Sequence, residues 1–196
     1  MYWWLLKQCT ILVRKKGGKI GEMALKLDMS KAYDRVEWVS LNKVMEKLGF
    51  ADRIRDLIMR CVSMVTYSVK INGVPRGHII SSRGIRQRDP LSPYLFLSCA
   101  EGLSTLIQSA MDRGQMKGVK ICRGGLRLSH LFFADDSLIF CKATLKECDE
   151  LQRLLGVYEK ASGQQLNHTK TTLFFSSNTS RDVQEEIKTR FGAQII

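Results

Sequence analysis

The sequence predicts an α+β fold in which a mainly antiparallel sheet carries helices packed on one face. Apolar residues recur at alternate positions in some segments and at every third or fourth position in others, which indicates both strands and helices. The predicted order is strand, two helices, hairpin, helix, hairpin, helix and strand. Because helices do not alternate one for one with strands, a doubly wound parallel sheet fits less well.

The first predicted elements are a strand and two amphipathic helices. Residues 22–28 alternate as a strand, with Lys26 and Asp28 on its polar face. Residues 41–48 and 54–62 place apolar side chains at helical spacing, so each predicts a helix with one apolar stripe.

Turn and capping residues delimit the middle of the chain. Residues 65–72 are rich in β-branched side chains, and the following Asn72-Gly73 turn predicts a hairpin. Ser92 and Pro93 predict the start of a long helix, with Ser92 as N-cap and Pro93 in the first turn.

The last predicted elements are a second hairpin, a helix and a strand. Residues 126–142 predict a hairpin whose turn holds two adjacent aspartates. Residues 148–158 carry a helical stripe that ends near Gly163, and residues 171–176 predict a final strand. The charged tail beyond them predicts one more helix.

The composition indicates an ordinary globular chain with an excess of positive charge. The 196 residues are 44% hydrophobic and 26% charged, which argues against a disordered chain. The net charge is 31 − 19 = +12. Such an excess favours a polyanionic partner, of which nucleic acid is the commonest, although a merely basic surface stays open.

Cysteine and histidine spacing gives no sign of a zinc site or a disulfide framework. The six cysteines have no C-x-x-C spacing and several lie at apolar positions, so we expect reduced core residues of an intracellular protein, nuclear or cytoplasmic. We see no targeting signal, and no apolar run long enough to span a membrane. The oligomeric state does not follow from the sequence.

Asp135 and Asp136 lie side by side within an apolar run, and this is the strongest sign of chemistry. Burial of two unpaired carboxylates is costly, so cations are expected beside them. Asp28 ends a separate predicted strand. If the two strand ends meet, three acids would bind two Mg²⁺ ions, with Mn²⁺ as a possible substitute. The alternative is a polar β-turn of no special function.

Four segments together resemble the reverse transcriptases of plant non-LTR (LINE-type) retrotransposons. Phe133-Ala134-Asp135-Asp136 resembles the two-aspartate turn of that family, and LKLDMSKAYDRVEW (residues 25–38) resembles its first catalytic motif. RGIRQRDPLSP (residues 83–93) resembles the motif before the long palm helix, and SGQQLNHTKT (residues 162–171) the later lysine-bearing motif. The resemblance implies a right-hand polymerase palm with partial fingers, spanning residues 20–180.

The resemblance also implies a role for individual residues. Asp28 and Asp135 would hold two metal ions with help from the Met29 carbonyl, and Asp136 would support them. The partners implied are an RNA template, a DNA primer and dNTPs. The other implied roles are nucleotide binding by Tyr33, Gln87 and Arg86, catalysis at the triphosphate by Lys170, and nucleic-acid binding by Arg76, Arg83 and Arg88.

Each of these further assignments has a structural alternative. The alternatives are a core aromatic for Tyr33, a solvated loop residue for Gln87 and a surface lysine for Lys170. Clustered arginines are often only a solvated face.

The sequence departs from the family pattern in one motif and at both ends. Arg88 stands where family members usually carry glycine, which permits a positive φ and close approach of a nucleotide. Residues 1–19 form an atypical basic segment, and residues 181–196 are interpreted as the start of a truncated C-terminal region. The alternative function is therefore a catalytically inactive retroelement fragment that at most binds nucleic acid through its charge.

Overall fold

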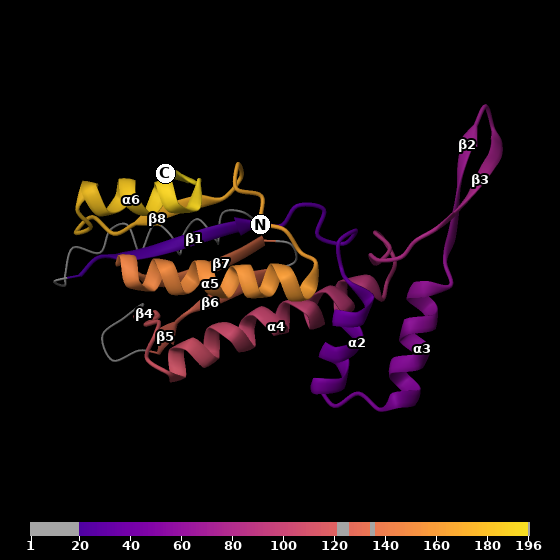
Figure 1. Cartoon of the computed structure of the whole chain (residues 1–196), viewed down its shortest axis with the longest axis horizontal. Helices are drawn as coiled ribbons and strands as arrows, with labels where there is room; N and C mark the ends of the chain where they lie inside the picture. The colour runs from indigo at the N-terminus through magenta and orange to yellow at the C-terminus, as the bar shows by residue number, and fades with distance from the viewer. Residues whose placement is uncertain (1–19, 121–125, 134–135, 196) are drawn as a thin grey trace.

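The computed structural model describes residues 20–120, 126–133 and 136–195. Its centre is a five-stranded sheet with the order β6-β7-β1-β8-β9 (Figure 1). All neighbours in this sheet are antiparallel except β8 and β9, which are parallel. The strands are β1 (Glu22–Asp28), β6 (His130–Phe133), β7 (Asp136–Lys142), β8 (Thr172–Phe175) and β9 (Gln194–Ile195).

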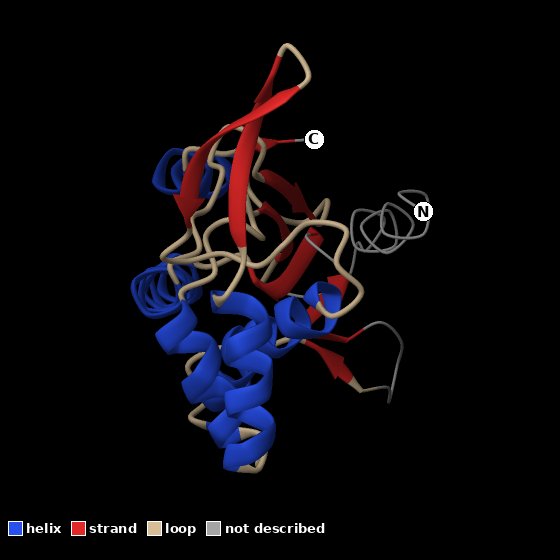
Figure 2. Cartoon of the chain, turned by 90° about the vertical axis from the view of Figure 1, so that its right-hand side faces the viewer, coloured by secondary structure: helices blue, strands red, loops and turns tan. Residues whose placement is uncertain are grey.

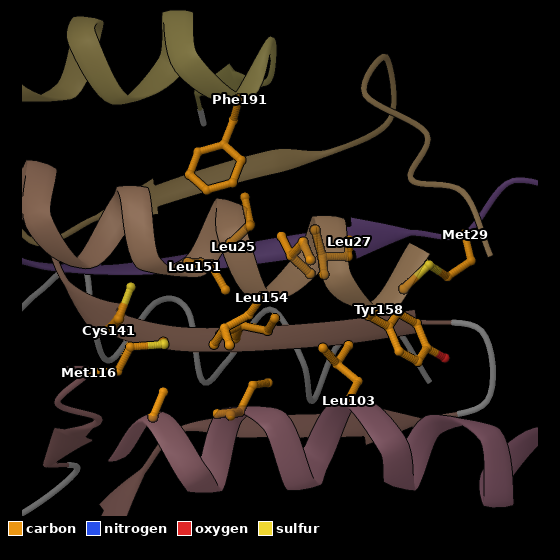
Figure 3. Close-up of a cluster of buried hydrophobic side chains, with 14 of the residues drawn as sticks. Leu25, Leu27, Met29, Leu103, Met116, Cys141, Leu151, Leu154, Tyr158 and Phe191 are labelled. Atoms are coloured by element: carbon orange, nitrogen blue, oxygen red, sulfur yellow. The ribbon is translucent and has the colours of Figure 1, made fainter. Parts of the chain in front are cut away.

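Helices cover one face of this sheet, so the predicted fold class is confirmed. Alternation in β1 turns Met23, Leu25 and Leu27 toward the helices, and all three are fully buried. Figure 3 shows Leu25 and Leu27 among side chains from the helices α4 and α5. The helices are α2 (Trp38–Lys47), α3 (Asp52–Ser63), α4 (Ser92–Asp112), α5 (Leu145–Ser162) and α6 (Arg181–Phe191).

The opposite face of the sheet carries a smaller apolar cluster built on Ala24, Leu138 and Phe140. It is partly covered by the short strands β4 (Val119–Lys120) and β5 (Arg127–Leu128). Residues 126–142 therefore do not form one continuous hairpin as predicted, because β5 pairs with β4 and the hairpin is β6–β7. A side chain at Gly118 would lie 2.5 Å from the Leu128 carbonyl oxygen, so glycine allows this pairing.

The hairpin predicted around Asn72-Gly73 is confirmed as β2 (Thr66–Ile71) and β3 (Val74–Ile80). Both turn residues have positive φ, 49° for Asn72 and 84° for Gly73, as a two-residue type I′ turn requires. This two-stranded ribbon projects away from the sheet in both views (Figures 1 and 2), and its residues are exposed along both strands.

Other predictions are confirmed with adjustments. The final strand and the tail helix are present as β8 and α6. The stripe predicted on α3 is only partly covered: Leu57 is 59% exposed, while Ile58 and Val62 pack against the core. The parallel strand β9 was not predicted. Within the described ranges, no helix combines the length and apolar character needed to cross a membrane.

The predicted N-cap of the long helix is wrong by one residue. Ser92 begins α4, and Leu91 precedes it as the N-cap. Asp89 accounts for the difference, because its Oδ1 accepts a hydrogen bond from the Leu91 backbone N at 2.9 Å. The chain is thereby turned before Ser92, and Pro93 lies in the first helical turn as predicted.

The buried cysteines behave as expected of core residues. Cys99, Cys141 and Cys148 are free and buried, and burial raises the thiol pKa to about 12 at Cys99 and about 11 at Cys148. Cys61 is free and exposed on α3. Cys9 and Cys122 lie outside the described residues.

The loop that follows β1, residues 29–37, is held on one side by the segment before α4. The Gly84 backbone N donates to the Val36 carbonyl oxygen at 2.8 Å, and the Ile85 backbone N donates to that of Tyr33 at 2.9 Å. Backbone pairing of this kind fixes the path of the loop without depending on side-chain chemistry.

The segment after α5 holds the same loop from the other side. The Glu37 backbone N donates to the Ser162 carbonyl oxygen at 3.1 Å, and the Gln164 Nε2 donates to that of Ala32 at 2.8 Å. Two sequence-distant segments therefore determine the conformation of residues 29–37.

We predict that Gly163→Ala lowers the free energy of unfolding by about 2 kcal/mol or more. Gly163 caps α5 at φ 76°, and an added Cβ would lie 2.6 Å from the Arg35 carbonyl oxygen. Both the backbone conformation and the loop contact would be strained. Urea denaturation followed by circular dichroism measures the change.

Gly156→Ala is the matched control in the same helix. An added Cβ at Gly156 meets no atom within 4 Å, so removing a helix-interior glycine should stabilise the protein by about 0.5–1 kcal/mol. Equal effects of the two substitutions would contradict the proposed contact between α5 and the loop.

Candidate active site

Asp28 and Asp136 lie directly opposite each other at the ends of β1 and β7. Side chains of a directly opposed pair share one face of a sheet. Since Leu27 points toward the helices, Asp28 and Asp136 lie on the face that the helices leave open. The predicted meeting of two acids from distant segments is therefore present in the fold.

The Asp28 carboxylate is partly exposed and has polar neighbours from one segment. Asn167 Nδ2 donates to Asp28 Oδ2 at 3.3 Å, and Lys170 Nζ lies 3.9 Å from the same oxygen. The Asn167 backbone N also donates to the Asp28 carbonyl oxygen at 2.9 Å. The lysine-bearing segment thus packs directly against the first predicted acid.

The Asp136 carboxylate has a different partner, a lysine from β1. Lys26 Nζ lies 3.1 Å from Asp136 Oδ1, and the two side chains are only 22% and 19% exposed. Lys26 stands two residues before Asp28 on the same face of the strand. Each acid therefore has its own cationic neighbour.

The third predicted acid, Asp135, lies outside the described residues. Among residues 20–120, 126–133 and 136–195, no three His, Cys, Asp or Glu side chains gather closely enough to bind a metal ion. The two opposed carboxylates are hard oxygen donors of the kind that Mg²⁺ prefers. The described donors therefore fit a divalent cation as part of a larger set.

A cleft of about 620 Å³ adjoins Asp28. It brings together several predicted site residues, with Lys31 and Asn167 beside them. Tyr33 lines the cleft and also stacks on Phe96, with ring centroids 5.1 Å apart. Tyr33 therefore serves both the core and the cleft. The predicted site residues that line the cleft are Asp28, Met29, Tyr33, Gln87, Arg88 and Lys170.

A neighbouring cleft of about 510 Å³ lies between α3 and the segment before α4. Arg83 and Arg86 line it, and Gln87 lines both clefts. Gln87 Nε2 donates to Asp34 Oδ1 at 3.4 Å. Arg76 is elsewhere, exposed on the projecting strand β3, so it does not join the predicted residues around Asp28.

Arg88 has a backbone conformation that favours glycine. Its φ is 66°, in the left-handed region where an L side chain is strained. The segment therefore keeps the backbone shape that glycine would allow, although the residue is arginine. Its exposed side chain adds a positive charge to the cleft beside Asp28.

The profile of the family described as "Reverse transcriptase (RNA-dependent DNA polymerase)" matches residues 7–189. The chain belongs to the reverse transcriptase family. This match covers most of the 196 residues, so it includes both the opposed acids and the segments that hold the loop between them.

Known relatives of this reverse transcriptase domain include proteins of non-LTR retrotransposons, which confirms that resemblance. This chain is 29% identical over 129 residues to the Pol polyprotein of the type-1 retrotransposable element R2 of Popillia japonica. The match covers 66% of this chain and 20% of the relative. The chain is 49% identical over 67 residues, or 34% of its length, to an uncharacterized mitochondrial protein of Arabidopsis thaliana, of which it covers 55%. The chain thus spans about half or less of these relatives.

Telomerase from Candida tropicalis has a similar fold. The apo form without its C-terminal domain matches with a TM-score of 0.60 at 16% identity, covering 88% of this chain and 34% of the telomerase chain. At this identity the match shows the fold alone, which is that of a polymerase palm.

Three site residues were not identified from the sequence. Lys26, Lys31 and Asn167 all lie within the quoted motifs, but their importance depends on which acid or cleft they reach. Strand register determines the neighbour of Lys26, and the paths of two loops determine those of Lys31 and Asn167; neither follows from the sequence. For Lys26 a signal was available in its spacing, because it precedes Asp28 by two residues in a strand and so shares its face.

We predict that Arg88→Gly stabilises the reverse transcriptase domain by about 0.5–1 kcal/mol. Relief of the left-handed strain, about 1–2 kcal/mol, exceeds the added freedom of the unfolded chain, about 0.5–1 kcal/mol. Chemical denaturation measures the difference.

Arg86→Gly is the control for this substitution. Arg86 is also exposed, and its backbone has no positive φ, so only the entropy of the unfolded chain changes. We expect a loss of about 0.5 kcal/mol. A loss of the same size for Arg88→Gly would contradict the strain at Arg88.

Proposed function

We propose that this domain is an RNA-directed DNA polymerase, which joins dNTPs to the 3′-hydroxyl of a DNA primer on an RNA template. The observation that carries the proposal is the opposition of Asp136 to Asp28, which itself lines a cleft together with Lys31, Arg88 and Lys170. Membership of the reverse transcriptase family supports the same reaction.

The acids are proposed to hold two Mg²⁺ ions, with Mn²⁺ as a substitute. Asp28 and Asp136 would contribute carboxylate oxygens, Met29 its carbonyl oxygen, and Asp135 the acid that the family motif implies. Bound divalent ions make the primer hydroxyl a better nucleophile and stabilise the charge that develops on the phosphate. Asn167 keeps the Asp28 carboxylate oriented toward the cleft by its hydrogen bond.

The triphosphate is proposed to lie along the cationic side of the cleft. Lys31, Arg88 and Lys170 all line it, and three positive charges suit the charge of a nucleotide triphosphate. Lys170 is 68% exposed, so its ammonium group can swing from Asp28 to the departing pyrophosphate. There it would donate a proton or neutralise the leaving charge.

Selection of the nucleotide is proposed to depend on Tyr33 and Gln87. Stacking on Phe96 fixes the Tyr33 ring at the cleft, where it would collide with a 2′-hydroxyl and so favour dNTPs. Gln87 is positioned by Asp34 at the boundary of the two clefts, within reach of either a nucleotide or a template base.

Template and primer are proposed to bind through phosphate contacts. Arg83 and Arg86 line the second cleft, and Arg76 extends the basic surface along the projecting ribbon. The net charge of +12 favours binding to any nucleic-acid sequence, and such binding weakens steeply as salt rises.

An alternative function is nucleic-acid binding without catalysis. The observation that favours it is the left-handed Arg88, which puts a long side chain into the cleft where glycine would leave space. Binding by charge would survive this change, whereas nucleotide entry would not.

Primer extension on a poly(rA)/oligo(dT) duplex with Mg²⁺ tests the proposal. We expect incorporation of dTTP by the natural chain and a loss of about a thousand-fold or more in Asp28→Asn and in Asp135→Ala, because each substitution removes a negative ligand that stabilises the transition state through metal.

Asp182→Asn is the matched control, because Asp182 is exposed in the first turn of α6 and belongs to neither cleft. It should leave incorporation unchanged. An unchanged rate in Asp28→Asn would contradict the proposed site. If neither the natural chain nor Arg88→Gly incorporates dTTP while both still bind the duplex, the alternative function is favoured.

A further inference from the structure

The Lys26–Asp136 ion pair lies at the end of β1 and β7 where the two acids oppose each other. The reaction described above gives it no role. Two carboxylates directly opposed on antiparallel strands repel each other. Asp28 and Asp136 are such a pair, and both belong to the central sheet. Some other charge has to compensate the repulsion when metal is absent.

Lys26 is placed to provide that charge. It lies on β1 opposite Leu138, two residues along the ladder from the opposed acids, so it reaches Asp136 diagonally. The 3.1 Å contact between Lys26 Nζ and Asp136 Oδ1 is largely withdrawn from water, with both side chains less than a quarter exposed. Removing one partner of such a partly buried ion pair destabilises the protein, because the remaining charge is left without compensation.

The two acids differ in how firmly they are held. Asp28 is 31% exposed, its lysine neighbour is 3.9 Å away and 68% exposed, and its other side-chain contact is the neutral amide of Asn167. Asp136 is less exposed and closer to its cation. The Asp28 carboxylate is therefore the easier of the two for an incoming ion to reach.

We infer that Lys26 is a positioning residue that neutralises Asp136 and holds its carboxylate, so that the two opposed acids are stable before metal binds. The inference deepens the proposed function, on which it rests for the identity of the metal site. It assigns different tasks to the acids: Asp28 receives the cation, while Asp136 is the acid that Lys26 compensates.

The test compares Lys26→Met with Lys26→Arg by thermal unfolding, in EDTA and in saturating Mn²⁺. Methionine retains much of the stem and removes the charge, whereas arginine keeps the charge. In EDTA we expect Lys26→Met to unfold about 5 °C or more below the natural chain. Mn²⁺ should restore most of this loss, since the ion replaces the missing positive charge. Lys26→Arg should stay close to the natural chain.

A second readout is the affinity for Mn²⁺, measured by electron paramagnetic resonance of the free ion. Releasing Asp136 from its lysine should tighten Mn²⁺ binding in Lys26→Met about ten-fold, because another carboxylate becomes available to the ion. Adding Asp136→Asn to Lys26→Met should recover the unfolding temperature in EDTA. A lysine that only packs its stem would give no change in affinity and no such recovery.

The chain contains a matched control in a second ion pair of the same two strands. Lys142 Nζ lies 2.6 Å from Glu22 Oε1 at their other end, far from the opposed acids, with similarly limited exposure. Lys142→Met should also unfold at a lower temperature, but Mn²⁺ should not restore it. An equal response of Lys26→Met and Lys142→Met to Mn²⁺, or unchanged Mn²⁺ affinity in Lys26→Met, would overturn the inference.

These readouts do not require polymerase activity. If primer extension fails while Lys26→Met still shows the Mn²⁺-dependent recovery, the proposed function is wrong and the role of Lys26 remains supported. If extension succeeds and the recovery is absent, only the role of Lys26 is wrong.

Discussion

The pairing of β1 with β7 is the constraint on which the rest of the structure depends. Its register puts apolar side chains of both strands against the helices and leaves Asp28 facing Asp136 on the open face. A slip of one residue would turn these acids into the core and the apolar residues out. The same alternation that stabilises the fold therefore brings two repelling charges together, and cations have to offset them. Lys26 and Lys170 are the cations that the described residues supply.

The site is also tied to the fold through the loop of residues 29–37. Backbone hydrogen bonds with residues 84–85 on one side and with residue 162 on the other hold this loop, so motifs far apart in sequence form one unit. The loop in turn carries residues of the cleft beside Asp28. In contrast, the ribbon β2–β3 projects away from the sheet and is exposed, so changes there should leave the acids in place.

Most elements were predictable because their signals are local. Alternation and helical spacing identified the strands and helices, and Asn72-Gly73 determined the hairpin turn. The N-cap of α4 was displaced because the Asp89 side chain bonds the Leu91 backbone N, a contact that capping preferences at Ser92 do not reveal. Strand β9 is only two residues long and pairs in parallel with β8, so it is too short for an alternating pattern to predict it. The partners of the acids depend on cross-strand register, which the sequence leaves undetermined until the strands are paired.

The proposed site holds divalent cations between Asp28 and Asp136, two acids from distant parts of the chain. Paramagnetic broadening of amide NMR signals by substoichiometric Mn²⁺ tests it most directly. Signals around Asp28 and around Asp136 are expected to broaden together, while those of the ribbon β2–β3 and of α6 stay sharp. Absence of broadening around Asp28 and Asp136, or broadening concentrated on the exposed acids of α6, would contradict a cation site between the opposed acids.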